Sequence, residues 1–237
     1  MKRFWRDVAV VPGGGFRIAL DRQPIRTPGR APLAVPTRIL AEAIAAEWRG
    51  VEGEIDPRAM PLTGLANAAI DRVAPDPASF AAGLARYAES DLLCYRADTP
   101  APLVARQAAA WDPLLDWARA RYDVHFQVTS GVMHIAQPPA TVARLSEAIA
   151  ARHPFELAPL SIVTTITGSL VMALAAAECT FDPDTLWHAA QVDEDWQREQ
   201  WGDDALATQA REARRAEYDA AIAFLVASQA RDASNEA

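Results

Sequence analysis

The stretch from Leu157 to Ala177 constrains the fold most, because it carries no charged residue and is long enough to span a membrane. Glutamates, Glu156 and Glu178, flank it in place of the basic or aromatic anchors of a membrane helix. Polar or helix-disturbing residues also interrupt it, namely Pro159, Ser161, Thr164, Thr165, Thr167, Gly168 and Ser169. We therefore expect a buried core helix here and no stable membrane insertion.

The N-terminal part of the chain has the pattern of short strands. Apolar residues alternate over 16–20, and strands are also expected at 7–11 and 25–27. Three glycines at 13–15 separate the first two strands. Because a strand pattern follows them, and neither GxGxxG nor GK[ST] is present, they predict a hairpin turn and not a phosphate-binding loop.

Helical patterns dominate the remainder. Thr37 is expected to cap a helix that ends near Trp48 and buries Leu40 and Ile44 on one face. Asp112 and Pro113 predict a kink or restart within another helix, and two short strands are expected between 124 and 135. The other expected helices cover residues 62–73, 77–89, 102–110, 141–152, 182–202 and 204–227.

These elements indicate an α+β fold class. We expect a small N-terminal domain of mixed strands and helix at residues 1–56, followed by a mainly α-helical orthogonal bundle at residues 57–237. The boundary lies in an irregular segment that contains Gly53, Pro57 and Pro61.

Composition excludes several classes of protein. Of the 237 residues, 51% are hydrophobic and 23% are charged, which indicates a globular chain. The net charge of −8 lacks the basic excess of a nucleic-acid-binding protein, so no nucleic-acid partner is expected, whereas a basic protein partner is compatible with it.

Catalytic and metal-binding motifs are missing. The sequence contains no GxSxG, no HExxH and no Walker loop. The two cysteines lie far apart, and the four histidines show no ligand or triad spacing; these residues are Cys94, Cys179, His125, His134, His153 and His188. We expect no catalytic residue, no metal site and no cofactor.

The segment 192–202 is the most unusual part of the sequence. Asp193, Glu194 and Asp195 are consecutive acids on an expected helix, and Trp196 and Trp201 follow them. Consecutive helical residues point about 100° apart, so the three acids cannot all face the core. Either the helix has a solvated acidic face with two tryptophans packed beneath it, or it is an acidic, aromatic-rimmed patch that docks a basic partner.

The order of motifs along the chain resembles that of the ATP synthase assembly factor two family, the ATP-twelve chaperones. Two positions depart from the family pattern: Arg22 stands where a glycine is common, and Leu206 where an acid is common. The matching stretches are Arg3-Phe4-Trp5-Arg6-Asp7-Val8, Leu20-Asp21 with Pro24, Thr27-Pro28, Ala45-Ala46-Glu47-Trp48, Met60-Pro61-Leu62-Thr63, Ala69-Ile70-Asp71, Tyr87 with Asp91-Leu92-Leu93-Cys94-Tyr95-Arg96-Ala97, Gln107 with Trp111-Asp112-Pro113-Leu114-Leu115, Gly168-Ser169-Leu170, and Val192-Asp193-Glu194 with Trp196-Gln197 and Trp201-Gly202.

The resemblance implies a task. A family member binds the unassembled alpha subunit of the F-type ATP synthase, protects its interface until assembly with the beta subunit, and is not an enzyme. Because this sequence starts at the shared Arg3-Phe4-Trp5 motif, without the targeting extension of mitochondrial relatives, we expect a bacterial, cytoplasmic protein.

The resemblance also implies roles for single residues. Glu194 matches a position thought to be essential, which places partner binding on Asp193, Glu194 and Asp195. Trp48 matches a tryptophan whose loss impairs family members. Because Trp48 lies on the predicted core face of its helix, it could act through stability, and it is grouped with Trp196 and Trp201 as structural or partner-supporting.

Two other functions stay open at this point. One is a hydrolase or transferase that uses the carboxylates at 193–195, alone or with Mg²⁺ or Ca²⁺, although adjacent helical residues chelate poorly. The other is a helical scaffold with a different partner.

Overall fold

A computed structural model describes residues 2–131, 133–202 and 204–230. The chain divides into two compact units, and each is discontinuous in sequence. Unit 1 contains residues 1–77, 153–159 and 219–237, and unit 2 contains residues 78–152 and 160–218. Three helices, α3, α6 and α10, contribute residues to both units. These units are defined by spatial contact, and each joins segments that are distant in the sequence. They therefore do not test the predicted boundary between two domains after residue 56, which stays a prediction.

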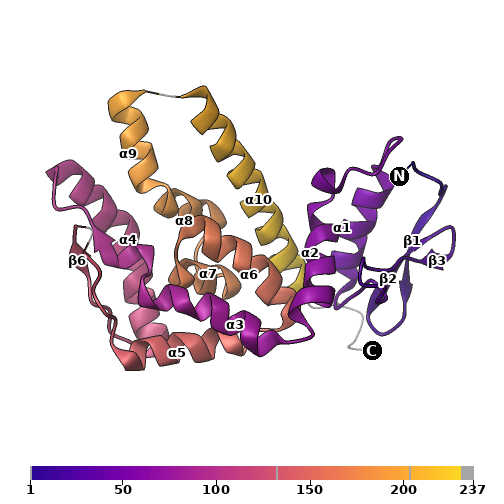
Figure 1. The fold of residues 1–237 in the computed structure, drawn as a ribbon, viewed down its shortest axis with the longest axis horizontal. Helices are drawn as coiled ribbons and strands as arrows, with labels where there is room; N and C mark the ends of the chain where they lie inside the picture. Colours follow the sequence, from indigo (N-terminus) through magenta and orange to yellow (C-terminus); the bar gives the residue numbers. More distant parts are fainter. Residues whose placement is uncertain (1, 132, 203, 231–237) are drawn as a thin grey trace. The chain divides into compact units, whose positions relative to one another are not determined.

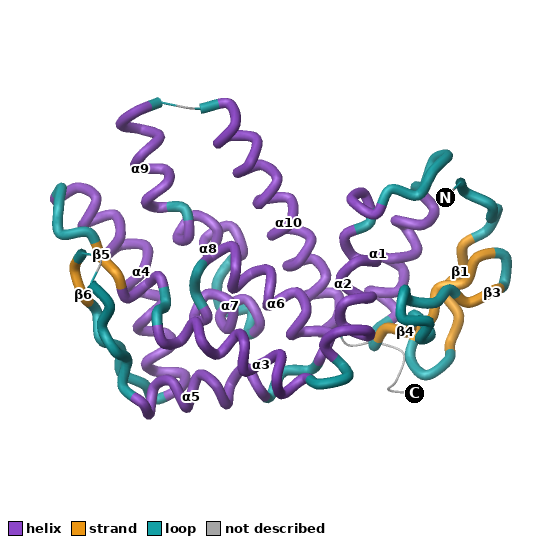
Figure 2. Tube along the Cα trace, in the orientation of Figure 1, coloured by secondary structure: helices purple, strands orange, loops and turns teal. Residues whose placement is uncertain are grey.

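Unit 1 combines a small antiparallel sheet with helices, and the predicted α+β class is confirmed (Figures 1 and 2). Strand β2 pairs with β1 on one side, and with β3 and β4 at opposite ends of its other side. Helix α1 packs on β1, β2 and α2. The elements are β1 (Val8–Pro12), β2 (Phe16–Leu20), β3 (Gln23–Pro24), β4 (Ala34–Val35), α1 (Arg38–Arg49), η1 (Pro57–Ala59), α2 (Pro61–Ala68) and the π-helical η2 (Ala69–Val73).

The predicted hairpin is confirmed. The three glycines form the turn between β1 and β2, and the Gly13 N–H donates to the Gly15 carbonyl at 2.8 Å. Gly15 has φ +100°, and a Cβ there would lie 2.6 Å from the Val35 carbonyl oxygen of β4. The third strand differs from the prediction: it lies at 23–24, ahead of the expected 25–27, because the tight turn at Asp21 and Arg22 already places Gln23 opposite Leu20 and Pro24 opposite Ala19.

The turn between β2 and β3 places two side-chain-bearing residues in the left-handed region. Asp21 has φ +47° and Arg22 has φ +73°. The steric cost of this conformation is offset at Asp21, because its carboxylate accepts the backbone N–H groups of Arg6 at 3.0 Å and Asp7 at 2.9 Å. Among the described residues, no contact of this kind is made by the Arg22 side chain, and only glycine adopts this backbone conformation without a steric cost.

We therefore expect Arg22→Gly to stabilise the protein by about 0.5–1 kcal/mol. The left-handed conformation costs an ordinary residue roughly 1–2 kcal/mol, and the greater unfolded-state entropy of glycine offsets about half of that. Thermal melting would measure the change. Arg22→Ala is the matched control, because alanine removes the side chain but keeps the Cβ. Equal melting temperatures for wild type and Arg22→Gly would contradict the expectation.

Helix α1 begins as predicted. The Thr37 hydroxyl accepts the Leu40 N–H at 3.1 Å, and the face with Leu40 and Ile44 is fully buried. Trp48 at the end of the same face is only half-buried. The helix thus fixes one side of the sheet and leaves part of Trp48 accessible.

Unit 2 is mainly helical, with a two-stranded parallel pair, β5 and β6 (Figure 2). Helix α4 packs on α7, α8 and α9. The elements, with α3, α6 and α10 shared between units, are α3 (Pro77–Ala85), η3 (Arg86–Glu89), η4 (Leu92–Cys94), β5 (Tyr95–Arg96), α4 (Ala101–Tyr122), β6 (Thr129–Ser130), α5 (Pro139–Ala150), α6 (Pro154–Thr167), α7 (Leu170–Ala177), α8 (Pro183–Ala190), α9 (Val192–Trp201) and α10 (Ala205–Gln229).

A kink or a restart was predicted at Pro113, and helix α4 shows that the restart is wrong. The helix is continuous through the proline. Trp111 before it and Leu114 and Leu115 after it are all buried, and the Trp111 indole N–H donates to the Ala189 carbonyl at 2.7 Å. Core packing on both sides of Pro113 outweighs the missing backbone hydrogen bond.

The uncharged stretch forms two helices and not the single one that was predicted. Gly168, with φ +66°, separates α6 from α7, and the Ser169 hydroxyl caps α7 by accepting the Met172 N–H at 3.0 Å. Every residue of α7 is buried, as expected of a core helix. Among the described residues, no helix has the length and apolar character needed to cross a membrane.

Two further expectations need correction. The segment 182–202 is divided at Gln191 into α8 and α9, because Gln191 leaves the helical conformation with φ −101° and ψ 5°. Of the two strands expected within 124–135, the described residues contain only β6, which pairs in parallel with β5 and not with a neighbour in sequence.

Candidate functional site

Several of the motifs singled out in the sequence are explained by folding contacts within unit 1. The Glu47 carboxylate caps α2 by accepting the N–H groups of Leu62 at 2.7 Å and Thr63 at 2.8 Å. Asp71 accepts the Thr27 hydroxyl at 2.6 Å and the backbone N–H of Gly29 at 2.8 Å. These acids join motifs that lie far apart in sequence, and so they have a structural role.

The same is true of two motifs in unit 2. Asp91 is fully buried and accepts the backbone N–H groups of Leu93 at 3.1 Å and Val171 at 3.0 Å. The Arg96 guanidinium lies 5.0 Å from the Trp111 ring and pairs with Asp112 at 2.9 Å. Both contacts hold the segment 91–96 against the helical core.

Helix α9 is different, because it has no buried residue. Trp196 is half-buried, and Trp201 is 80% exposed. The interpretation in which both tryptophans pack beneath an acidic face is therefore wrong for Trp201. A large aromatic residue is costly to leave in water, so this helix is the candidate functional site.

The three consecutive acids do not form one patch. Glu194 and Asp195 face α10. The Nη2 atom of Arg214 donates to both carboxylate oxygens of Glu194, at 2.7 and 2.8 Å. Asp195 forms an ion pair with Arg211 at 2.8 Å. Asp193 points the other way and accepts the Gln107 amide N–H at 2.7 Å. Each of these three acids thus has a partner within unit 2, and their carboxylates point to different sides of α9.

Helix α9 consequently has two faces. One face is ionic, and it borders a small polar cavity of about 480 Å³ that is lined by His188, Asp195, Arg198, Glu199 and Arg211. The other face borders a larger, open groove of about 860 Å³. The groove-facing residues recur at helical spacing, which places Asp193, Trp196, Gln197, Gln200 and Trp201 along one side.

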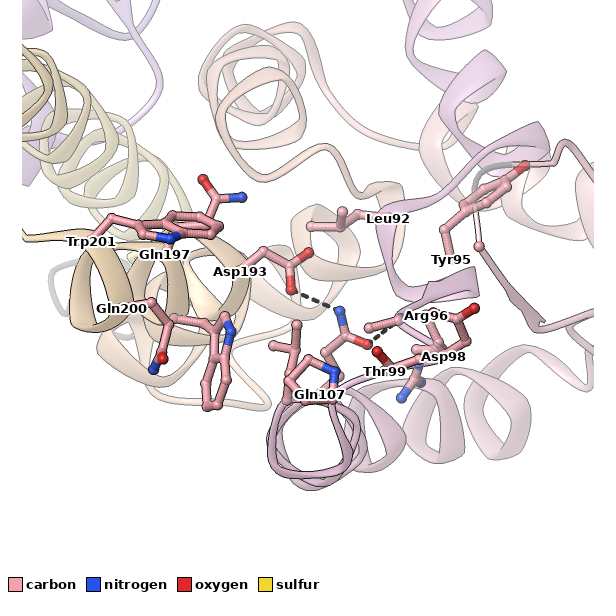
Figure 3. Close-up of a pocket in the computed structure, with 15 residues that line it drawn as sticks. Leu92, Tyr95, Arg96, Asp98, Thr99, Gln107, Asp193, Gln197, Gln200 and Trp201 are labelled. Carbon is pink, nitrogen blue, oxygen red and sulfur yellow. Dashed lines mark hydrogen bonds between the residues drawn. The ribbon is translucent and has the colours of Figure 1, made fainter.

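Figure 3 shows this groove, with the side chains of α9 on one side and the segment 92–100 on the other. Gln107 of α4 lies between them (Figure 3). Most of its lining surface is apolar, although seven of the fifteen lining residues are polar or charged. The residues other than those of α9 are Leu92, Tyr95, Arg96, Ala97, Asp98, Thr99, Pro100, Leu103, Gln107 and Gly131.

Gln107 fixes the two sides of the groove to each other. This residue is 2% exposed, and both polar atoms of its side-chain amide form hydrogen bonds. The nitrogen donates to the Asp193 carboxylate, and the oxygen accepts the Ala97 N–H at 2.7 Å. A buried amide with both ends satisfied holds its neighbours in one arrangement. The groove is therefore built into the fold of unit 2.

Arg106 supports α9 from the neighbouring helix. Its guanidinium lies 5.0 Å from the Trp196 ring centre and pairs with Glu199 at 2.7 Å. The hydrogen bond from Arg106 holds the pKa of Glu199 below its usual value, and it raises the pKa of Arg106. Both groups remain charged at neutral pH, so their pairing is constant there.

Trp48 lies in unit 1, in a separate aromatic cluster. Its ring meets Trp5 edge-on at 5.2 Å, and Trp5 meets Phe4 in the same way at 5.2 Å. Phe4 is 71% exposed, whereas Trp5 is 3% exposed. These contacts support a structural role for Trp48.

The carboxylates and thiols offer little chemistry. No group of three or more His, Cys, Asp or Glu residues within the described ranges is arranged to hold a metal ion. Burial raises the pKa of the Cys94 thiol to about 12, so this thiol is not a nucleophile at neutral pH. Since the acids at 193–195 diverge to different partners, the hydrolase interpretation has no support in this geometry.

Sequence reasoning identified α9 but not the residues that meet it from elsewhere. Gln107 belongs to one of the stretches that match the family, yet nothing in the sequence connects it with Asp193. Arg106, Arg214 and Asp98 carried no signal, because their significance depends on contacts across the fold.

Comparison with known proteins gives consistent results. A model of the ATP12 chaperone protein family matches residues 2–119. The crystal structure of Atp12 from Paracoccus denitrificans is similar over 96% of this chain and 98% of that one, with 41% identity and a TM-score of 0.92. A variant of that protein with lysine in place of an aspartate matches at 40% identity and a TM-score of 0.92, with the same coverage of both chains. A candidate chaperone from Agrobacterium tumefaciens matches at 41% identity and a TM-score of 0.89, covering 94% of this chain and 85% of that one.

Proposed function

The chain belongs to the ATP12 chaperone family, and we propose that it binds the unassembled alpha subunit of the F-type ATP synthase and protects its assembly interface until the beta subunit takes its place. Family membership makes the chain a chaperone of ATP synthase assembly and not an enzyme. We place the activity in the bacterial cytoplasm, where the alpha subunit is made.

The observation that carries the proposal is an exposed, mainly apolar groove in a protein of this family. An unassembled subunit presents apolar surface destined for a neighbour, and such surface aggregates while it is unpaired. A chaperone that covers this surface needs accessible aromatic groups, and Trp196 and Trp201 on α9 provide them. Release needs no nucleotide if the beta subunit competes for the same surface by mass action.

We place partner binding on α9 with different roles for its acids. Asp193 faces the groove and is the acid that can meet a partner directly. Glu194 and Asp195 hold α9 against α10 through Arg214 and Arg211, and so they position the groove-facing side. In this assignment Glu194 is a positioning residue.

Light scattering of the alpha subunit tests the proposal. Purified alpha subunit diluted from denaturant should aggregate alone, and an equimolar amount of this protein should suppress the scattering severalfold. Addition of the beta subunit should then displace the protein as alpha enters the catalytic sector. If the alpha subunit aggregates at the same rate with this protein as with an equal amount of serum albumin, the proposed partner is wrong.

A further inference from the structure

We propose that the groove of unit 2 recognises a short, accessible segment of its partner in which an apolar side chain lies next to a lysine or arginine. This inference rests on the proposed function, because it specifies which part of the alpha subunit the chaperone binds. Its basis is the combination of aromatic side chains, unpaired carboxylate and free amides along one groove.

The apolar part of the recognition comes from Trp196, Trp201 and Leu103. Trp196 is held in place by the Arg106 guanidinium on one side, so its orientation is fixed before binding. Trp201 is 80% exposed at the end of the same helix face. Fixed aromatic side chains bind apolar groups with little loss of conformational entropy, and tryptophan is enriched among residues that dominate binding energy.

The charge in the groove favours a cation. Asp98 is exposed, and within the described part of the chain it has no ion pair. Asp193 contributes a carboxylate whose contact is the neutral amide of Gln107. Arg96, the cation lining the groove, is already engaged by Asp112 and is stacked on a tryptophan ring. The local excess is therefore negative, as is the net charge of −8 for the whole chain.

Two exposed amides indicate that the ligand is a polypeptide segment. Gln197 and Gln200 lie on the groove side of α9. Among the described residues, neither side-chain amide has a hydrogen-bond partner. Amide side chains can donate to and accept from the backbone of a bound peptide. The groove is also open to solvent, which suits a polypeptide segment better than an enclosed small molecule.

The two kinds of contact should contribute differently. An exposed carboxylate such as Asp98 adds little affinity, because surface ion pairs are weak, but it selects the sign of the charge beside the apolar anchor. Trp201 should supply much more of the affinity. The proposal therefore predicts separable effects: loss of binding from a change at Trp201, and altered charge preference from a change at Asp98.

Overlapping peptides that cover the alpha subunit, immobilised on an array, test the inference with the full chain as the probe. The wild type should bind peptides with an aliphatic or aromatic residue next to Lys or Arg. Trp201→Asp should weaken this binding at least tenfold. Asp98→Lys should shift the preference toward peptides with Glu next to the apolar residue. Ile39→Asp and Glu212→Lys, at exposed positions on other helices, are the matched controls and should behave as the wild type.

The outcomes separate this inference from the proposed function. If Trp201→Asp and Asp98→Lys still melt like the wild type and still suppress alpha aggregation fully, the groove is not the binding site although the partner is correct. Binding to acidic peptides, to a second copy of this chain or to no peptide by the wild type would also overturn the inference. If the wild type fails to suppress alpha aggregation, the proposed function itself is wrong.

Discussion

Replacing Asp91 with alanine is expected to lower the free energy of unfolding by about 3–5 kcal/mol, because it leaves buried backbone N–H groups without an acceptor. The carboxylate serves Leu93 and Val171, and it lies at the beginning of α7, where a negative charge is favourable. For a chain of this size the loss corresponds to a melting temperature lower by about 10 °C. Thermal unfolding followed by circular dichroism would measure it.

The pH dependence of this effect has a defined sign. Burial raises the pKa of Asp91 from 3.8 to about 6, although the hydrogen bonds it accepts act to lower it. A carboxylate with a raised folded-state pKa contributes stability that is complete below pH 3.8 and is lost as pH rises through about 6. The stability difference between wild type and Asp91→Ala should therefore increase as pH falls from 7 to 5.

Asp98→Ala is the control, since Asp98 lies in the same segment but is exposed. It should change the free energy of unfolding by no more than about 0.5 kcal/mol. An Asp91→Ala protein that melts within a degree of the wild type would show that the buried carboxylate does not hold η4 and α7 together.

The second large effect concerns binding. Glu194→Lys should weaken binding to the alpha subunit at least tenfold, because it replaces the pair with Arg214 by two like charges and displaces α9. Both side chains are more than one-third exposed, at 34% and 40%, so the change in global stability should stay near 1 kcal/mol. Titration calorimetry and thermal melting on the same samples would measure the two quantities.

Exchanging the charges of Glu194 and Arg214 distinguishes a positioning role of Glu194 from a direct contact between Glu194 and the partner. In the double variant Glu194→Lys with Arg214→Glu, the pair is restored in reversed order. If Glu194 positions α9, as proposed, the double variant should recover most of the lost affinity. A double variant that is as stable as the wild type but still does not bind would show that Glu194 itself contacts the partner, and the assignment would be wrong.

The sequence was informative where local patterns determine structure. The alternation over Phe16–Leu20, the glycine turn before it and the Thr37 cap of α1 were each predicted and are each confirmed. These features depend on neighbours within a few residues, so their physical causes are visible in the sequence.

The errors concern elements that distant residues determine. The beginning of α7 after Gly168 is supported by Asp91, which accepts an N–H from the first turn of α7 across 80 sequence positions. The continuity of α4 through Pro113 depends on the buried tryptophan that hydrogen-bonds to α8. The sequence contains the residues involved, but not the fact that they meet.

The candidate site was also predicted only in part: the helix was identified, but the arrangement of its side chains was not. The composition of 193–201 indicated an unusual helix, but its acids were grouped by adjacency in the sequence. In the structure the positions of Arg214 and Gln107 separate Glu194 from Asp193 and produce two faces. The resemblance to a chaperone family, now confirmed, supplied the function that no catalytic or binding motif indicated.

The most direct test of the central proposal is the binding preference of the purified protein for the two states of the alpha subunit. In size-exclusion chromatography coupled to mass measurement, the protein should form a stoichiometric complex with free alpha subunit and should not co-elute with the preassembled alpha–beta hexamer. Co-elution with the hexamer at the same affinity, or the absence of a complex with free alpha, would contradict it.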